Sequence, residues 1–86
     1  MTRGEILAAI TGERERQHRK WDRDHDHGYG DCSSAGVPEA VKVAVLTEEA
    51  GEVARAFLDG DRAGLQRELV QVAAVAFAWL EGLSAS

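Results

Sequence analysis

Residues 59–80 read DGDRAGLQRELVQVAAVAFAWL, and this stretch decides the fold. Gly60 is suited to the end of one helix and Asp61 to the N-cap of the next, so the pattern predicts two helices joined by a very short turn. Helices joined in this way run antiparallel. We therefore expect a helical hairpin, with one helix over about residues 38–59 and the other over about residues 61–82.

The second helix of this hairpin is apolar around its whole circumference from residue 72 to residue 80. A helix of this kind must be covered on every side, and two partner helices from one short chain can hardly do so. We therefore expect this helix to pack against the same helix of another copy of the chain, in a homodimer or homotetramer. The main apolar stripe of this helix comprises Leu65, Leu69, Val72, Ala76, Trp79 and Leu80.

The helix predicted over residues 38–59 can begin at Pro38, because proline suits the first turn of a helix. Its apolar residues recur at alternating spacings of three and four, which is typical of a helix packed along one face. This stripe comprises Val43, Leu46, Ala50, Val53 and Phe57.

A further helix is predicted over about residues 2–21, where Thr2 and Glu5 have the spacing of a capping box. Its stripe begins with apolar residues but continues through Arg14 and Gln17 to Trp21. These polar residues at positions expected to face inward indicate either a polar cavity or a frayed helix end that is exposed to water. Residues 22–36 are rich in glycine, serine and aspartate and are expected to form a loop. The prediction is one all-α domain over residues 1–86, completed to a helical bundle by oligomerisation.

The composition is that of a soluble globular domain, with 86 residues, 44% apolar residues and a formal net charge of −5. The acidic balance argues against duplex nucleic acid as the partner. No apolar run of bilayer-spanning length is evident, so no membrane association is expected. Cys32 is the only cysteine, which excludes an internal disulfide and favours the cytoplasm.

Several carboxylates are predicted to meet between the two helices of the hairpin. Glu49 and Glu52 lie about 60° apart on one helix face, with Glu48 beside them, and Glu68 and Gln71 can face them from the next helix. Carboxylates that converge repel one another unless a cation lies between them, and Mg²⁺ prefers such oxygen ligands. The alternative is that these glutamates form an ordinary solvated helix surface.

The run Glu48-Glu49-Ala50-Gly51-Glu52 resembles the E-E-x-x-E motif of the MazG-like nucleotide pyrophosphohydrolases, which belong to the all-α NTP pyrophosphatase superfamily. Residues 68–71 stand where that family has E-x-x-D, with Gln71 in place of the aspartate. Residues 17–21 are similar to the family's Q-x-x-K-W segment, so the resemblance covers nearly the whole chain. The change to Gln71 removes one negative charge, which should weaken metal binding.

The resemblance implies a hydrolase that cleaves the α–β phosphate bond of a nucleoside triphosphate with Mg²⁺, or with Mn²⁺ in its place. It implies that the metal is held by Glu49, Glu52, Glu68 and Gln71, and that Glu48 orients or deprotonates the attacking water. Beyond what the resemblance implies, we infer that this segment of the first helix contacts substrate through Gln17, Lys20 and Trp21.

We expect Lys20 or a nearby arginine to meet the triphosphate and Trp21 to stack on the base. A solvated helix face for Lys20 and a core aromatic for Trp21 are the structural alternatives. The alternative function is a catalytically weakened nucleotide-binding or helical oligomerisation module, with Gln71 marking a decayed site.

The histidines of the expected loop give only a weak signal. His25, His27 and Cys32 lack the paired spacing of a zinc site, and the alternating aspartates that precede them do not complete a calcium-binding loop. Both metal sites are therefore set aside, and Cys32 is interpreted as a free loop thiol.

Overall fold

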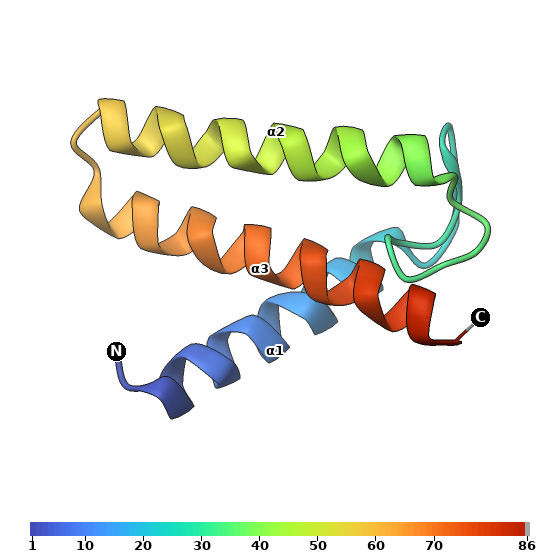
Figure 1. Ribbon diagram of the computed structural model, residues 1–86, viewed down its shortest axis with the longest axis horizontal. Coiled ribbons are helices and arrows are strands. Elements are labelled where there is room, and N and C mark those ends of the chain that lie inside the picture. The colour runs from blue at the N-terminus through green and yellow to red at the C-terminus, as the bar shows by residue number, and fades with distance from the viewer. Residues whose placement is uncertain (86) are drawn as a thin grey trace.

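The computed structural model describes residues 1–85, which form three helices and one small hairpin (Figure 1). The predicted all-α class is confirmed. In chain order the elements are α1 (Arg3–Trp21), β1 (Asp24–His25), β2 (Gly28–Tyr29), α2 (Glu39–Leu58) and α3 (Arg62–Ala85).

The helix ends are set by the local signals of the sequence. Thr2 and Glu5 form the capping box, with Thr2 Oγ1 accepting from the Glu5 amide at 3.1 Å and Glu5 Oε1 accepting from the Thr2 amide at 3.0 Å. Gly60, which follows the C-cap Asp59 of α2, has φ of +68°, and Asp61 Oδ1 accepts from the Gly64 amide at 2.8 Å to cap α3. The turn between α2 and α3 is therefore as short as the sequence predicts.

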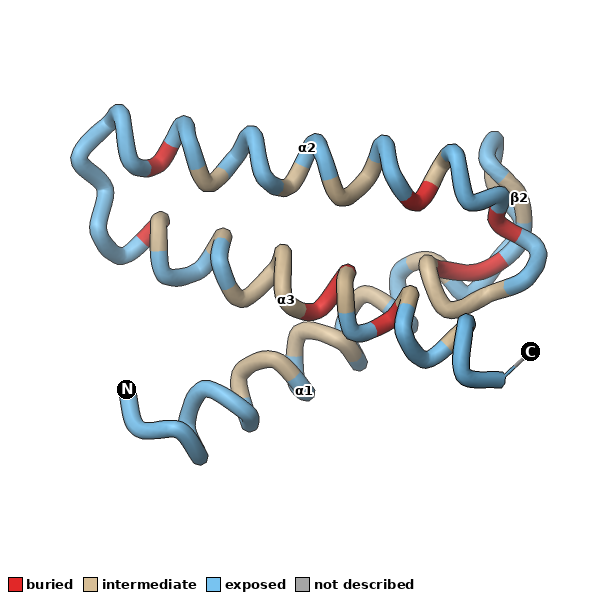
Figure 2. The backbone as a smooth tube through the Cα atoms, viewed as in Figure 1, coloured by how far each residue is buried: buried red, intermediate tan, exposed pale blue. Residues whose placement is uncertain are grey.

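Helix α3 is the central element of the molecule. Helix α2 runs antiparallel along one side of it, and α1 crosses its other side at an angle (Figure 1). The buried apolar residues lie along α3 and at its contacts with its neighbours (Figure 2); they are Val37, Ala56, Ala74, Val75 and Ala78. Most of these side chains are small, so the helices approach closely but bury little apolar area.

The C-terminal part of α3 is packed against the loop that precedes α2. A Cβ atom placed on Gly82 would lie 2.7 Å from the carbonyl oxygen of Ser33, so the loop backbone occupies the space that a side chain would need. Helix α3 continues past this glycine to Ala85, beyond the expected end near residue 82.

The face that α2 turns inward differs from the predicted apolar stripe. Val43 and Phe57 of that stripe are 51% and 65% exposed, whereas Lys42 and Ala56 are the buried residues of α2 among those described. The reason is that the inward face of α2 also carries Glu49 toward α3, which a purely apolar stripe does not anticipate. The predicted stripe is therefore only partly covered: Leu46 and Val53 are half-buried, whereas Val43, Ala50 and Phe57 are exposed.

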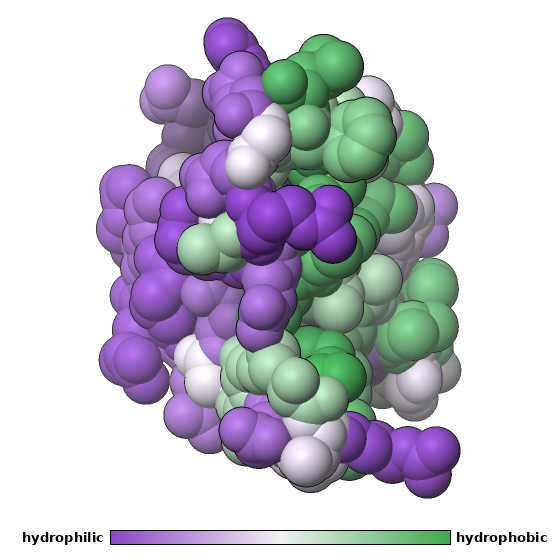
Figure 3. Space-filling view, turned by 90° about the vertical axis from the view of Figure 1, so that its left-hand side faces the viewer, coloured by the Kyte–Doolittle hydropathy of each residue, from purple (hydrophilic) through white to green (hydrophobic). Residues whose placement is uncertain are grey.

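Helix α3 also keeps large apolar side chains at the surface of the single chain. Phe77 is 50% exposed, and Leu69, Leu80 and Leu83 are more exposed still. Seen from the end where α2 and α3 are joined, hydrophobic residues gather on one side of the molecule and hydrophilic ones on the other (Figure 3). By length and composition alone α3 could also cross a membrane, a property that it shares with apolar core helices of soluble proteins.

The segment over residues 22–36 contains a short β-hairpin that the sequence prediction missed. Strands β1 and β2 pair antiparallel, with Asp24 opposite Tyr29 and His25 opposite Gly28. Two-residue strands are too short to show an alternating pattern, so the loop prediction was wrong at this point. Gly28 has φ of +124°, and any side chain there would collide with the Gly36 carbonyl.

Candidate functional site

A cavity of about 140 Å³ lies where the second half of α1, the β-hairpin formed by β1 and β2, α2 and the middle of α3 meet. One part of its wall is apolar and is formed by Val37, Val41, Val45 and Val75. The polar part includes five of the eight site residues that the sequence predicts, and these are Gln17, Lys20, Trp21, Glu49 and Gln71. Three separate helices therefore bring most of the predicted site into one hollow.

Gln71 lies between two carboxylates, one from each helix of the hairpin. Carboxylate oxygens only accept hydrogen bonds, so the Gln71 amide turns its nitrogen toward them. In this orientation the nitrogen donates to Glu68 Oε2 at 2.8 Å and to Glu49 Oε2 at 3.0 Å. The amide thus holds Glu49 and Glu68 together and partly offsets their repulsion.

The electrostatic environment of Glu49 is strongly negative. Burial raises the pKa of Glu49 above its ordinary value, because the ionised carboxylate loses contact with water. Neighbouring carboxylates raise the pKa further, in the order Glu68, Glu48, Glu52 and Glu13. Glu49 is therefore the centre of the acidic cluster that the sequence predicts.

The other two predicted carboxylates are arranged differently. Glu48 and Glu52 are exposed on α2 and do not line the cavity, although their charges act on Glu49. Within residues 1–85 no three His, Cys, Asp or Glu side chains converge in a metal-binding arrangement. The donors that do converge are two carboxylates and the Gln71 amide, whose oxygen can replace its nitrogen by rotation. Such an all-oxygen set suits Mg²⁺, which also keeps several water ligands.

Trp21 forms an aromatic wall of the cavity with positive charge around it. The His25 ring meets the indole edge-on, with 5.3 Å between the ring centroids. The Lys20 ammonium lies 5.1 Å from the centroid of the indole ring and the Arg23 guanidinium 5.7 Å from it. An aromatic surface next to cations is suited to a planar ring that carries phosphate.

His25 is held in one tautomer by backbone groups. Its Nε2 donates to the Gly30 carbonyl at 2.7 Å, because a carbonyl oxygen can only accept. Its Nδ1 accepts from the His27 amide at 3.2 Å. His25 was not among the predicted site residues, because the short β-hairpin that places it in the cavity has no sequence pattern of its own.

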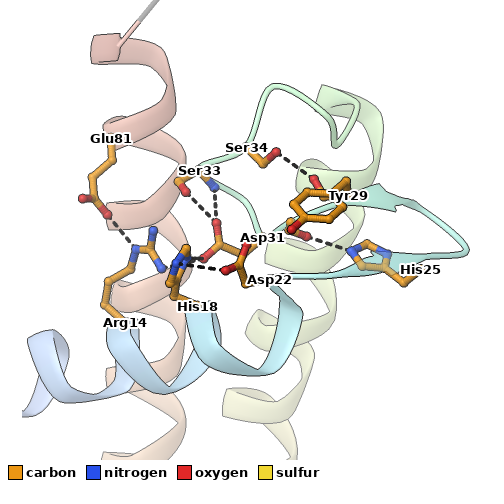
Figure 4. Close-up of polar contacts among 10 residues, drawn as sticks. Arg14, His18, Asp22, His25, Tyr29, Asp31, Ser33, Ser34 and Glu81 are labelled. Carbon is orange, nitrogen blue, oxygen red and sulfur yellow. Dashed lines mark hydrogen bonds and ion pairs between the residues drawn. The ribbon is translucent and has the colours of Figure 1, made fainter.

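A buried ion pair connects α1 to Asp31, a loop residue that lines the cavity (Figure 4). Arg14 Nη1 lies 2.6 Å from Asp31 Oδ2, and Arg14 Nε lies 2.6 Å from Glu81 Oε1. Asp31 Oδ1 accepts from the amide and the hydroxyl of Ser33, and His18 Nδ1 lies 3.2 Å from Oδ2. This network fixes the end of α1 against the loop and α3.

These contacts decide between the two interpretations of the polar stripe on α1. Gln17 lines the cavity and Arg14 is paired in the interior, so the stripe faces a polar interior instead of running out into water. Two further lining residues, Arg16 and Cys32, were not predicted as site residues. Burial and the nearby Asp31 charge raise the pKa of the Cys32 thiol, which disfavours the nucleophilic thiolate form.

Comparison with known proteins gives no match to a protein family, to a curated protein or to a solved structure. The resemblance to the MazG-like enzymes stays a prediction, and it rests on the sequence motifs.

Proposed function

We propose that the protein is a Mg²⁺-dependent nucleoside triphosphate pyrophosphohydrolase, which releases a nucleoside monophosphate and pyrophosphate. The observation that carries the proposal is the shared cavity, where Gln17, Lys20 and Trp21 of α1 face Glu49 of α2 and Gln71 of α3. An aromatic wall at one part of the cavity, and at another part Glu49, which Gln71 bridges to Glu68, are what a nucleotide with a metal-bound phosphate chain requires.

The predicted site residues take three different chemical roles. Glu49, Glu68 and Gln71 would hold the metal, with Glu52 as a further ligand from the next turn of α2. Bound Mg²⁺ supplies charge neutralisation on the phosphates and activation of water. Glu48, which is exposed on α2, is assigned to orient or deprotonate the attacking water. Lys20 or a nearby arginine is assigned to the phosphate chain.

The proposal predicts pyrophosphate release from at least one nucleoside triphosphate when the purified protein is supplied with Mg²⁺ or Mn²⁺. Glu49→Gln and Glu52→Gln should each lower the rate by more than about 100-fold, because each removes an expected charged ligand. The control is Glu39→Gln, which removes a carboxylate from the first turn of α2. A folded wild-type protein that releases no pyrophosphate from any common or damaged triphosphate would overturn the proposal.

A second candidate function is favoured by the position of Gln71. Its amide stabilises the Glu49–Glu68 pair without a metal, as expected of a site that binds nucleotide or supports oligomerisation without chemistry. The Gln71→Asp variant separates the two candidates and is treated in the Discussion.

We further propose that the protein works as a homodimer or homotetramer with α3 at the interface. The support is that the single chain leaves Phe77 and the neighbouring leucines of α3 half exposed or more. Large apolar side chains in this number on one helix are expected to be covered by a second copy.

Phe77→Asp is expected to weaken self-association by more than about 100-fold, because it places an unpaired charge in an apolar interface. Size-exclusion chromatography with light scattering measures the effect. Tyr29→Asp is the matched control, because Tyr29 is 52% exposed but lies on the hairpin, whereas Phe77 is 50% exposed on α3. A wild-type protein that is monomeric at all concentrations would contradict the proposed assembly.

A further inference from the structure

A second hollow shares Gln71 with the cavity as a lining residue. It is an open groove of about 620 Å³ between α1 and α3. Arg16 and Gln71 line both the cavity and the groove, so the two hollows meet at these residues. The charged residues of the groove are Glu13, Arg16, Arg19 and Arg67.

The charges in the groove do not cancel. Glu13 is paired with Arg16, its neighbour on α1. Arg19 of α1 and Arg67 of α3 make no ion pair and no side-chain hydrogen bond with the part of the chain that the structure describes. Two guanidinium groups without partners therefore border one groove from both helices, in a chain whose net charge is −5.

The two hollows differ in chemistry, and this difference indicates how a nucleotide would be oriented across them. The cavity has an apolar and aromatic wall, which suits a nucleobase. The groove offers guanidinium groups, whose planar donors match phosphate oxygens. Gln71, which links Glu49 to Glu68, lies where the two hollows meet.

We propose that this groove binds the pyrophosphate end of a nucleoside triphosphate, and that Arg19 and Arg67 donate hydrogen bonds to its phosphate oxygens. The base then lies in the cavity and the α-phosphate lies near Gln71. Water attacks the α-phosphorus, the bond from that phosphorus to the bridging oxygen breaks, and pyrophosphate leaves with the bridging oxygen while one proton passes to solvent. The orientation of the triphosphate rests on the proposed function, but pyrophosphate binding in the groove does not require hydrolysis.

The test is calorimetric titration of the full chain with inorganic pyrophosphate, with and without Mg²⁺. Arg19→Gln and Arg67→Gln are each expected to weaken pyrophosphate binding about tenfold, because each removes charge-assisted hydrogen bonds to phosphate. Arg62→Gln is the matched control, since it removes the same charge from α3 but lines neither hollow, and it should change the affinity less than about twofold. Arg19 and Arg67 are exposed, so both variants should fold, which circular dichroism verifies.

The outcomes separate this proposal from the proposed function. Pyrophosphate binding that depends on Arg19 and Arg67 in a protein without hydrolytic activity supports the groove and overturns the hydrolase. Hydrolysis accompanied by unchanged pyrophosphate affinity in both variants overturns the groove and leaves the hydrolase standing. Absence of pyrophosphate binding by the wild-type protein, or an equal loss in Arg62→Gln, also overturns the groove.

Discussion

The Arg14→Gln variant is expected to be less stable than the wild-type protein by roughly 2–4 kcal/mol in its free energy of unfolding. The Arg14 side chain is 13% exposed and that of Asp31 only 5%, with 2.6 Å between the guanidinium and the carboxylate. Glutamine is too short and carries no charge, so the buried Asp31 carboxylate would keep only Ser33 and His18 as partners. A buried charge that loses its main partner is strongly destabilising, even where the intact pair adds little.

Urea unfolding at neutral pH measures this difference. Glu81→Gln is the matched control, because it removes the other carboxylate that Arg14 contacts, whose side chain is 48% exposed. An exposed ion pair contributes little, so this control should lose less than about 1 kcal/mol. An equal loss in the two variants would show that the burial of Asp31 is not the source of the effect.

The same pair predicts how the difference depends on pH. Burial by itself would raise the pKa of Asp31, but hydrogen bonds from the side chain and backbone of Ser33, together with Arg14, outweigh it and lower that pKa. A lowered pKa contributes stability above the ordinary carboxyl pKa, and this stability is lost as the pH falls through the pKa of the folded state. The difference in the free energy of unfolding between the wild-type protein and Arg14→Gln should therefore become smaller in acid, once Asp31 is protonated.

The helix ends and the hairpin of α2 and α3 could be predicted because the signals are local. Thr2, Gly60 and Asp61 each act on backbone groups within a few residues of themselves, so the sequence shows both partners. The inward face of α2 could not be predicted in the same way. The apolar stripe through Val43 and Phe57 is the stronger periodic signal, but the single chain leaves these two residues exposed.

The candidate site was predictable to the extent that helices alone place it. The spacing from Glu49 to Glu68 and Gln71 is set by two helices and one short turn, and the structure brings these three side chains together. His25 and Asp31 were missed because they depend on the path of the loop. That path depends on contacts between residues distant in sequence, such as Arg14 with Asp31, and no local sequence pattern predicts these contacts.

Gln71→Asp is expected to lower the free energy of unfolding by roughly 2–4 kcal/mol in metal-free buffer. The change replaces a donor that bridges Glu49 and Glu68 with a third negative charge in the same place. The pKa of Glu49 is already raised by burial and by its acidic neighbours, and the new carboxylate should raise it further. The folded variant then binds a proton more tightly than the unfolded chain, so part of the lost stability should return as the pH falls.

Thermal denaturation of wild type and Gln71→Asp with EDTA and with Mg²⁺ distinguishes a weakened metal centre from a site in which Gln71 serves only packing. If Gln71 weakens a metal centre, Mg²⁺ should raise the melting temperature of the variant by more than that of the wild type, because tighter binding to the folded state adds stability by mass action. Pyrophosphate release should rise with it. Gln66→Asp is the control, since it adds the same charge at an exposed position of α3. A variant that is destabilised but gains nothing from Mg²⁺ would show that Gln71 holds the two glutamates together for packing, and would favour the binding module over the hydrolase.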